Sequence, residues 1–166
     1  MEVFAIQCCT SSTLLISMRF LTDKISKLCI GWNERLLSEN DFYRLCKRFR
    51  VKVTEMPLRT GGFYYRVMGK DYIAVNSGLA GPQKLVVLFH ELGHFLLYTP
   101  ESGASANFHG VGRRTRKERE ADLFALCSLI PTASIERGSI DELIDDEGFP
   151  PEMVEARREI FMRYGI

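Results

Sequence analysis

The sequence predicts one α+β domain, in which a small, mainly antiparallel sheet of three strands packs beside a pair of neighbouring helices. Three short runs of β-branched and aromatic residues, separated by glycine and proline, lie in the first half of the chain and resemble strands. In two longer stretches that follow, apolar residues recur every three or four positions, which is the spacing of a buried helix face. A helical pattern before the strands and another at the end complete the order helix, three strands, three helices.

The length and composition of the chain predict one domain with one core. The chain has 166 residues, of which 46% are apolar. We expect the domain to cover residues 21–166. Residues 1–20 form an N-terminal extension that is either a disordered tail or an over-long gene prediction, with Met18 as the alternative start. This stretch lacks the basic segment and the clean cleavage site of a signal peptide.

Charge, cysteine content and hydropathy argue against several classes of protein. A formal net charge of +1 disfavours a dedicated nucleic-acid binder, which would be strongly basic. The five cysteines are odd in number and show no C-x-x-C spacing, which favours a reduced, cytoplasmic compartment over disulfides. No run approaches the roughly 18 apolar residues of a membrane span, so we expect no membrane partner.

The first helical patterns lie on either side of Ser38. Residues 22–37 show only a patchy pattern. The stretch from Ser38 to Arg50 is stronger, because the residues Ser-Glu-Asn-Asp at its start are good helix caps. Its apolar face consists of Phe42, Leu45, Cys46 and Phe49.

Three strands are expected next. Residues 51–55 alternate between apolar and polar like a strand, and Pro57 closes that strand. Residues 63–68 and 72–75 are aromatic and β-branched runs joined through Gly69-Lys70-Asp71, which predicts a hairpin.

The following helix is expected from Gly81 to Tyr98. Pro82 suits its first turn, where the missing N–H has no intrahelical partner, and Thr99-Pro100 ends it. Gly93 would cost about 1 kcal/mol relative to alanine in such a helix. We therefore expect a neighbouring segment to pack closely there. The apolar stripe of this helix consists of Leu85, Leu88, Leu92 and Leu96.

This helix carries the pentad His-Glu-Leu-Gly-His at positions 90–94. Residues four apart lie on one face of a helix, so His90 and His94 are placed to bind one Zn²⁺ opposite the leucine stripe. Glu91 lies beside them, where a carboxylate acts as general base toward zinc-bound water. The match can arise by chance, but it uses two of only three histidines in the chain. The pentad predicts a metallopeptidase centre that lacks one protein ligand.

The missing ligand is expected on the next helix, residues 116–130, which starts charged and becomes apolar. Glu118 and Asp122 share one face of it. Glu118 would complete the zinc site, and Asp122 would accept a hydrogen bond from the free ring nitrogen of a zinc histidine. Glu120 is the alternative ligand, but it is rotated by roughly 200° from Glu118, so only one can face the metal. A third interpretation makes all three acids solvated surface. Small residues on the same side, which would let the two helices approach, are Ala121 and Ala125.

These two blocks together resemble the ImmA/IrrE family of bacterial and phage metallopeptidases. The pentad HELGH is followed here by E-x-E-A-D-x-F-A and a closing Ile-Pro pair, where members usually carry E-x-x-A-N-x-F-A-x-x-L-L-M-P. The resemblance covers roughly residues 38–131. It places the first glutamate of the family on Glu118, and so implies that Glu118 rather than Glu120 is the third zinc ligand. The chain departs from the pattern at Asp122, where asparagine is common, and at Ser128, where leucine is usual.

The resemblance implies a zinc-dependent metalloendopeptidase whose centre lies between a zincin-like pair of active-site helices. It also implies that the substrate is a helix-turn-helix transcriptional repressor, a DNA-binding protein that would be cleaved in trans. Two alternatives stay open. A non-catalytic zinc-containing regulatory or interaction protein would keep the ion as a brace, although structural zinc sites usually have four protein ligands. A DNA-binding regulator would need a basic domain or a helix-turn-helix pattern, and the sequence shows neither.

Further residues are candidates for substrate contact. Zincin proteases usually bind substrate as an additional strand along a sheet edge beside the zinc helix, and Tyr72–Ser77 leads directly into that helix. His109, in the glycine- and serine-rich loop 100–112, is either a substrate contact or polar surface. A basic patch before the second helix either steers an acidic substrate or is solvated surface. Its arginines are Arg113, Arg114 and Arg116.

The C-terminal part of the chain shows two more patterns. Residues 141–147 are acidic and are expected to form a loop or a short exposed helix. Pro150-Pro151 opens a final amphipathic helix. Its expected inner face carries Met153, Val154, Arg157, Ile160 and Phe161.

Overall fold

The computed structural model describes residues 21–98, 105–106, 115–138, 140–145 and 147–166. The described elements confirm the α+β class, with helices before and after a small sheet. In chain order they are α2 (Glu39–Phe49), β1 (Lys52–Met56), β2 (Gly62–Val67), β3 (Lys70–Asn76), α3 (Gly81–Leu97), β4 (Ser105–Ala106), α4 (Arg116–Leu129), α5 (Thr132–Glu136), α6 (Ile140–Asp145) and α7 (Pro151–Tyr164).

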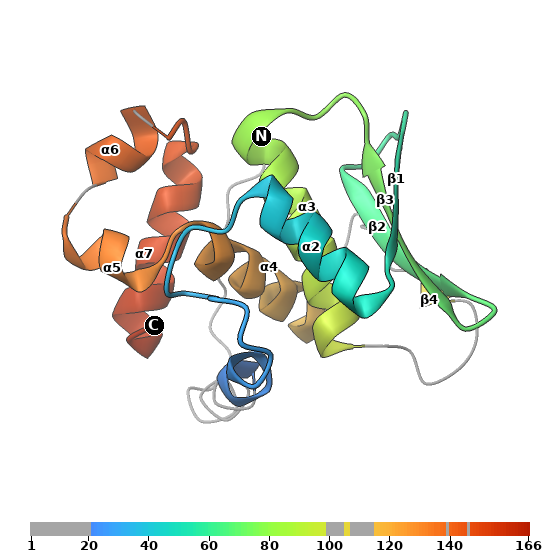
Figure 1. Cartoon of the computed structure of the whole chain (residues 1–166). Helices are drawn as coiled ribbons and strands as arrows, with labels where there is room; N and C mark the ends of the chain where they lie inside the picture. Colours follow the sequence, from blue (N-terminus) through green and yellow to red (C-terminus); the bar gives the residue numbers. More distant parts are fainter. Residues whose placement is uncertain (1–20, 99–104, 107–114, 139, 146) are drawn as a thin grey trace.

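The elements form successive layers (Figure 1). The sheet lies at one side of the molecule, and α2 and α3 cover its inner face. On the side of α3 away from the sheet lies α4, and α7 packs against α4 with α5 and α6 beside it. The core is continuous across these layers, because α3 contacts the sheet, α2 and α4. The central position of α3 places the HELGH pentad between the sheet and α4.

The sheet is mixed, with the strand order β1-β3-β2-β4. The predicted hairpin of β2 and β3 is confirmed as an antiparallel pair, and the two-residue strand β4 pairs antiparallel with the outer edge of β2. The sheet is mainly antiparallel, as expected, but it is mixed, because β1 pairs with β3 in parallel. The cause is the connection 57–61. It leads from β1 to β2 across the position between them that β3 occupies. Backbone bonds from Asn76 to Gly61 (2.8 Å) and from Ser77 to Met56 (3.0 Å) hold that connection.

The hairpin turn differs by two residues from the expected Gly69-Lys70-Asp71. Val67 pairs with Lys70, so the connection consists of Met68 and Gly69 alone. Both have positive φ, 50° and 73° respectively, as a type I′ turn requires. Lys70 and the residue after it therefore belong to β3.

Residues 22–37 form much less helix than their pattern predicts, because only 21–26 are helical. Positive φ angles at Cys29 (50°) and Asn33 (60°) are incompatible with a continuing helix. The segment instead crosses the C-terminal end of α4, where four carbonyls have no intrahelical partner. The Asn33 amide donates to the Cys127 carbonyl (3.2 Å), and the Leu37 amide donates to the Ser128 carbonyl (2.9 Å). One turn earlier, the Trp32 indole donates to the Phe124 carbonyl (2.9 Å). This extended segment therefore supplies hydrogen-bond donors to carbonyls at the C-terminal end of α4.

The close approach expected at Gly93 is present between α3 and α4. A β-carbon at Gly93 would lie 3.1 Å from Cδ1 of Phe124 and 3.3 Å from Cα of Ala121. Both alanines of α4, Ala121 and Ala125, are fully buried. Small residues on both helices therefore let the two backbones come together, and this contact fixes how far α4 lies from the two histidines.

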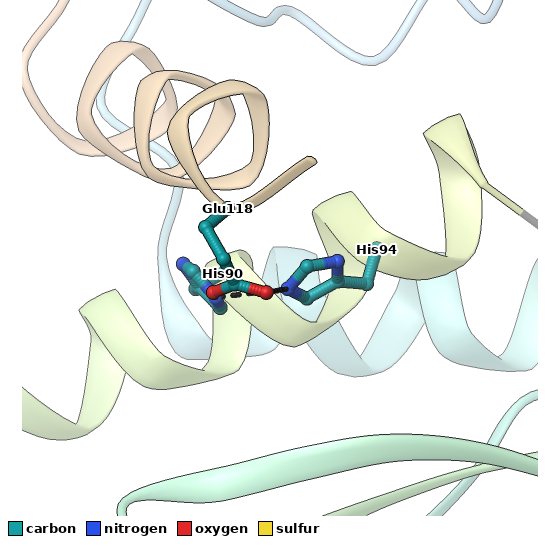
Figure 2. A group of neighbouring side chains, drawn as sticks. All are labelled: His90, His94 and Glu118. Atoms are coloured by element: carbon teal, nitrogen blue, oxygen red, sulfur yellow. Dashed lines mark hydrogen bonds and ion pairs between the residues drawn. The ribbon is translucent and has the colours of Figure 1, made fainter. Parts of the chain in front are cut away.

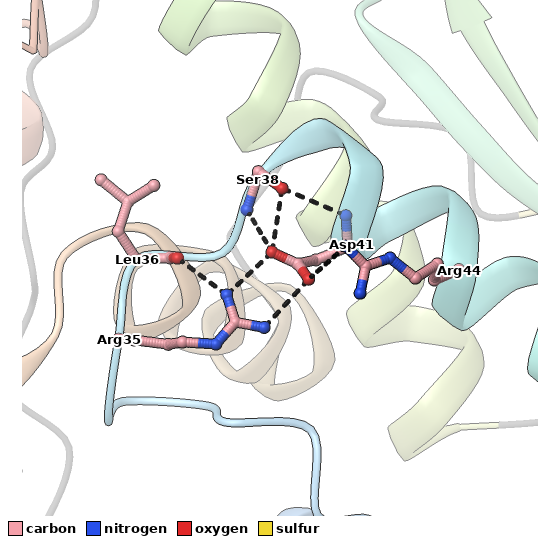
Figure 3. Close-up of polar contacts among 5 residues, drawn as sticks. All are labelled: Arg35, Leu36, Ser38, Asp41 and Arg44. Atoms are coloured by element: carbon pink, nitrogen blue, oxygen red, sulfur yellow. Dashed lines mark hydrogen bonds and ion pairs between the residues drawn. The ribbon is translucent and has the colours of Figure 1, made fainter.

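The expected caps at the start of α2 are present (Figure 3). Ser38 is the N-cap and forms a capping box with Asp41 at the third helical position. Arg35 adds a bidentate ion pair, because its two terminal nitrogens lie 2.8 and 2.9 Å from the two Asp41 carboxylate oxygens. These hydrogen bonds hold the pKa of the Asp41 carboxyl below its usual range, the largest contribution coming from Arg35.

Asp41→Ala should destabilise the fold by about 2 kcal/mol, because it removes a cap and an ion pair from a mostly buried carboxylate. Since the pKa of Asp41 is lowered by folding, its contribution is complete above the unfolded pKa of about 4 and declines as the pH falls below it. Urea denaturation at pH 7 and at pH 3 measures both effects, with exposed Asn40→Ala as the control. If wild type and Asp41→Ala differed by the same free energy of unfolding at both pH values, the role of the charge would be contradicted.

The C-terminal helices close the core on the side away from the sheet. The acidic stretch is helical as α6, and α7 begins at Pro151 as expected. The fully buried Arg157 of α7 binds four acceptors on other segments, which joins α7 to the residues around α5. These acceptors are the carbonyls of Ile130 and Ile166, the Asn33 side-chain oxygen and the Thr132 hydroxyl. Across the described ranges, the helices are too short or too polar to cross a bilayer.

Candidate active site

Two imidazoles from one turn of α3 meet at the buried centre of the molecule. His90 and His94 lie in the continuous helix Gly81–Leu97, so their spacing of four places both on one face. Both side chains are almost completely buried, and their Nε2 atoms are 3.0 Å apart. Two ligands of one cation would converge in this way.

Glu118 completes the group from α4 (Figure 2). Thr115 caps α4 by accepting a hydrogen bond from the Glu118 amide, and the Glu118 side chain extends toward the histidines from this first turn. Its Oε1 lies 3.2 Å from Nε2 of His94, and its Oε2 lies 3.4 Å from Nε2 of His90. One ligand atom from each of the three residues falls within 4.8 Å of the others. Two imidazole nitrogens and a carboxylate oxygen are a donor set that suits Zn²⁺.

Glu120, the alternative third ligand, lies elsewhere on α4. Its carboxylate is buried but accepts a hydrogen bond from Nε of Arg116 at 2.8 Å. Burial raises the pKa of the Glu120 carboxyl to about 7. The interpretation of the three acids as solvated surface is also wrong, because Glu118 and Asp122 contact the histidines and Glu120 is covered.

Asp122 makes the contact that was expected with a histidine of the pentad. Its Oδ1 lies 2.8 Å from Nδ1 of His90, the ring nitrogen on the side away from Glu118. Burial lowers the pKa of His90, but the bonds to Asp122 and Glu118 outweigh burial and raise it to about 9. An acidic environment that favours positive charge on this ring also favours a divalent cation beside it.

Comparison with protein families matches residues 46–147 to the IrrE N-terminal-like domain, a family of peptidases. The match covers more than half of the 166 residues and includes the whole of α3 and α4. The chain belongs to this peptidase family. No curated protein and no solved structure matches the chain significantly.

Membership of the IrrE N-terminal-like family agrees with the geometry of the site. The matched region carries the HELGH pentad and the first turns of α4, where His90, His94 and Glu118 come together. It ends before α7, so the last helix lies outside the matched region. The family and the cluster together indicate a peptidase with a group that can hold a metal ion.

Glu91, the residue between the two histidines in the motif, faces the sheet. It is fully buried, and its Oε2 accepts a hydrogen bond from the backbone N–H of Tyr64 in β2 at 2.8 Å. This partner was not predicted from the sequence, because a backbone donor leaves no side-chain signal. The adjacent glycines Gly61 and Gly62 are the one signal that was available, since glycine in a strand often marks a close approach of another segment.

The strand that contacts Glu91 of α3 is β2, which corrects the assignment of Tyr72–Ser77 as the substrate-binding edge. Most of that segment forms β3, which is the central strand, with β1 on one side and β2 on the other. Its backbone groups are therefore already paired. On the side of the site, β4 pairs with residues 65 and 66 of β2. The edge at residues 62–64 lies beside Glu91, which accepts the N–H of Tyr64.

The remaining candidates for substrate contact are only partly described. His109, Arg113 and Arg114 lie outside the described residues. Arg116 is the first residue of α4, exposed and bonded to Glu120. The structure thus brings together the three expected ligands and Asp122, while the substrate role of the basic patch stays a prediction.

Asp122→Ala should lower zinc affinity or turnover by about 10–100-fold, because the carboxylate fixes the ring of His90 and strengthens it as a donor. Asp122→Asn keeps an acceptor oxygen and should have a mild effect. Zinc dissociation constants from competition with a chelator, together with thermal melting, separate a change in the site from unfolding. Equal zinc affinity in wild type and Asp122→Ala, with full turnover, would contradict this role.

Proposed function

We propose that this protein is a zinc-dependent metalloendopeptidase that cleaves a helix-turn-helix transcriptional repressor in trans. The observation that carries the enzymatic part is the His90–His94–Glu118 cluster in a chain of a peptidase family. Three protein ligands are typical of catalytic zinc, which keeps one position open, whereas structural zinc usually has four. The repressor as substrate is supported by the resemblance of the two motifs to the ImmA/IrrE family.

Each residue of the site has a separate role in the proposed reaction. His90, His94 and Glu118 would hold the ion, which when bound supplies a Lewis acid that polarises the scissile carbonyl and activates water. The Glu91 carboxylate then acts as general base: it accepts a proton from the attacking water and delivers it to the leaving amine nitrogen. Asp122 keeps the His90 ring oriented through Nδ1. Burial of the histidines and of Glu91 excludes bulk water from these groups.

The substrate is proposed to bind as an extended peptide along the edge of β2 at residues 62–64, through backbone groups other than the Tyr64 N–H, which donates to Glu91. This edge lies beside Glu91 and continues the line of β4 along the sheet. Backbone pairing of this kind fixes the orientation of a peptide largely independently of its sequence. We also place the protein in the cytoplasm, where a DNA-binding substrate would be found and where the free thiols of Cys29, Cys46 and Cys127 would stay reduced.

The test uses the zinc-loaded full chain and, as probe, the helix-turn-helix repressor encoded nearest to its gene. Mass spectrometry should show cleavage at a defined bond, and the zinc chelator 1,10-phenanthroline should abolish it. A repressor of the same class from an unrelated locus is the matched control. Stoichiometric zinc with no cleavage of this repressor or of unfolded casein would favour the alternative, a non-catalytic zinc-containing regulatory protein.

A further inference from the structure

The carboxylate of Glu91 is bound to the main chain of the sheet. Its Oε2 accepts the N–H of Tyr64 at 2.8 Å, in a position where the Glu91 side chain is fully buried. A helix side chain and a strand backbone, 27 residues apart in sequence, are thus joined at the one acidic residue of the pentad.

The register of the hairpin explains why the Tyr64 N–H is available for this bond. Next to the two-residue turn, Val67 and Lys70 form a hydrogen-bonded pair, and hydrogen-bonded pairs alternate along an antiparallel ladder. Tyr64 and Ile73 are therefore a non-hydrogen-bonded pair, so the N–H of Tyr64 points away from β3. The described part of β4 pairs with residues 65 and 66 and stops before Tyr64. An outward strand N–H normally bonds to water or to another strand, but here it bonds to a buried carboxylate.

The short distance between β2 and α3 depends on Gly62. A β-carbon at this position would lie 2.8 Å from the Ala74 carbonyl oxygen and 2.9 Å from Cγ1 of Val87. It would also lie 3.5 Å from Cγ of Glu91 itself. The first two distances are shorter than real β-carbon contacts, and the first involves backbone that cannot rotate away. Any side chain at position 62 therefore forces β2 to shift relative to β3 and α3.

We propose that the N–H of Tyr64 positions the Glu91 carboxylate for proton transfer, and that Gly62 is a positioning residue which permits this contact. The inference rests on the proposed function, in which Glu91 is the general base. A fixed hydrogen bond to one carboxylate oxygen restricts rotation of the group. The carboxylate then keeps one orientation relative to His90 and His94, which belong to the same helix. Proton transfer is sensitive to such orientation, because a displacement of about 1 Å can lower the rate about 100-fold.

The first test requires no substrate. Amide hydrogen exchange of the ¹⁵N-labelled, zinc-loaded full chain is measured by NMR for wild type, Glu91→Ala and Glu91→Gln. The Tyr64 amide should exchange about tenfold or more faster in Glu91→Ala, because its acceptor is gone, and should stay largely protected in Glu91→Gln. Tyr65, whose N–H belongs to the β2–β3 ladder, is the internal control. Equal exchange of the Tyr64 amide in wild type and Glu91→Ala would overturn the proposal.

The second test compares two adjacent glycines. Gly62→Ala should keep stoichiometric zinc while kcat on the repressor falls about 10–100-fold at nearly constant KM, and the Tyr64 amide should lose its protection. Gly61→Ala is the matched control, because a β-carbon there meets only side-chain atoms, the nearest being Cγ2 of Val87 at 3.0 Å. It should resemble wild type. Wild-type kcat and Tyr64 protection in Gly62→Ala would overturn the proposal.

The two tests separate this inference from the proposed function. If wild type holds zinc but cleaves nothing, the enzymatic proposal fails while the exchange experiment still decides whether the strand holds Glu91. If wild type is active and the exchange rate of the Tyr64 amide is the same in wild type and Glu91→Ala, the positioning role alone fails. The exchange comparison needs no glycine variant, so it decides the proposal even if Gly62→Ala does not fold.

Discussion

Glu91→Gln is expected to remove cleavage while leaving both zinc binding and the fold intact. Gln has nearly the size of Glu, and its side-chain oxygen can still accept the N–H of Tyr64, so the packing against β2 is preserved. Its amide cannot accept a proton from water at neutral pH. Loss of a general base typically lowers the rate by about 10²–10⁴-fold. Repressor cleavage followed by mass spectrometry, with zinc content measured on the same sample, checks the result.

The control for Glu91→Gln is a change of charge that does not affect the site. Glu155→Gln, on the exposed side of α7, removes one carboxylate far from the pentad in sequence and should cleave as wild type does. Full cleavage by Glu91→Gln, on a repressor that wild type also cuts, would remove Glu91 from the mechanism. Loss of zinc in Glu91→Gln would instead show that the carboxylate acts through the metal site.

The parts of the fold that the sequence predicted are those specified by local periodicity. The leucines of α3 recur at helical intervals because one face of that helix is buried, and Leu88 and Leu92 are indeed fully covered. Ser38 could be recognised as a cap because capping depends on residues only three positions apart. The register of α4 relative to α3 was accessible for a similar reason. The spacing of Glu118 and Asp122, together with small alanines, specifies which face of α4 meets the histidines.

The parts that could not be predicted depend on partners distant in sequence. Nothing in β1 itself indicates that it pairs with β3 rather than with β2, because pairing is decided by the path of residues 57–61. Residues 27–37 leave the helical pattern because the end of α4 supplies acceptors for their donors, about ninety residues further along the chain. The bond from Tyr64 to Glu91 uses a backbone N–H, which every residue except proline possesses. Periodicity and motif spacing contain no information about such contacts.

The second prediction with a large effect concerns the third zinc ligand. Glu118→Ala is expected to lower zinc affinity by more than about 100-fold, since removal of even a hydrogen-bonding partner of a ligand typically costs 10–100-fold. The reason is geometric: the Glu118 oxygens lie 3.2 and 3.4 Å from the two histidine nitrogens, and the remaining two imidazoles would hold the ion alone. His90→Ala and His94→Ala should have similar effects. Competition with a fluorescent zinc chelator measures all three.

Glu120→Ala is the matched control, because it removes an acid two positions away on the same helix. Its carboxylate bonds to Arg116 rather than to the histidines, so zinc affinity should stay close to that of wild type. Thermal melting identifies any variant that loses zinc by unfolding. If Glu120→Ala lost zinc while Glu118→Ala kept it, α4 would have to be rotated by roughly 200° about its axis. That rotation would separate Ala121 from Gly93 and Asp122 from His90. A single pair of substitutions therefore tests the identity of the ligand and the packing of the two helices that place it.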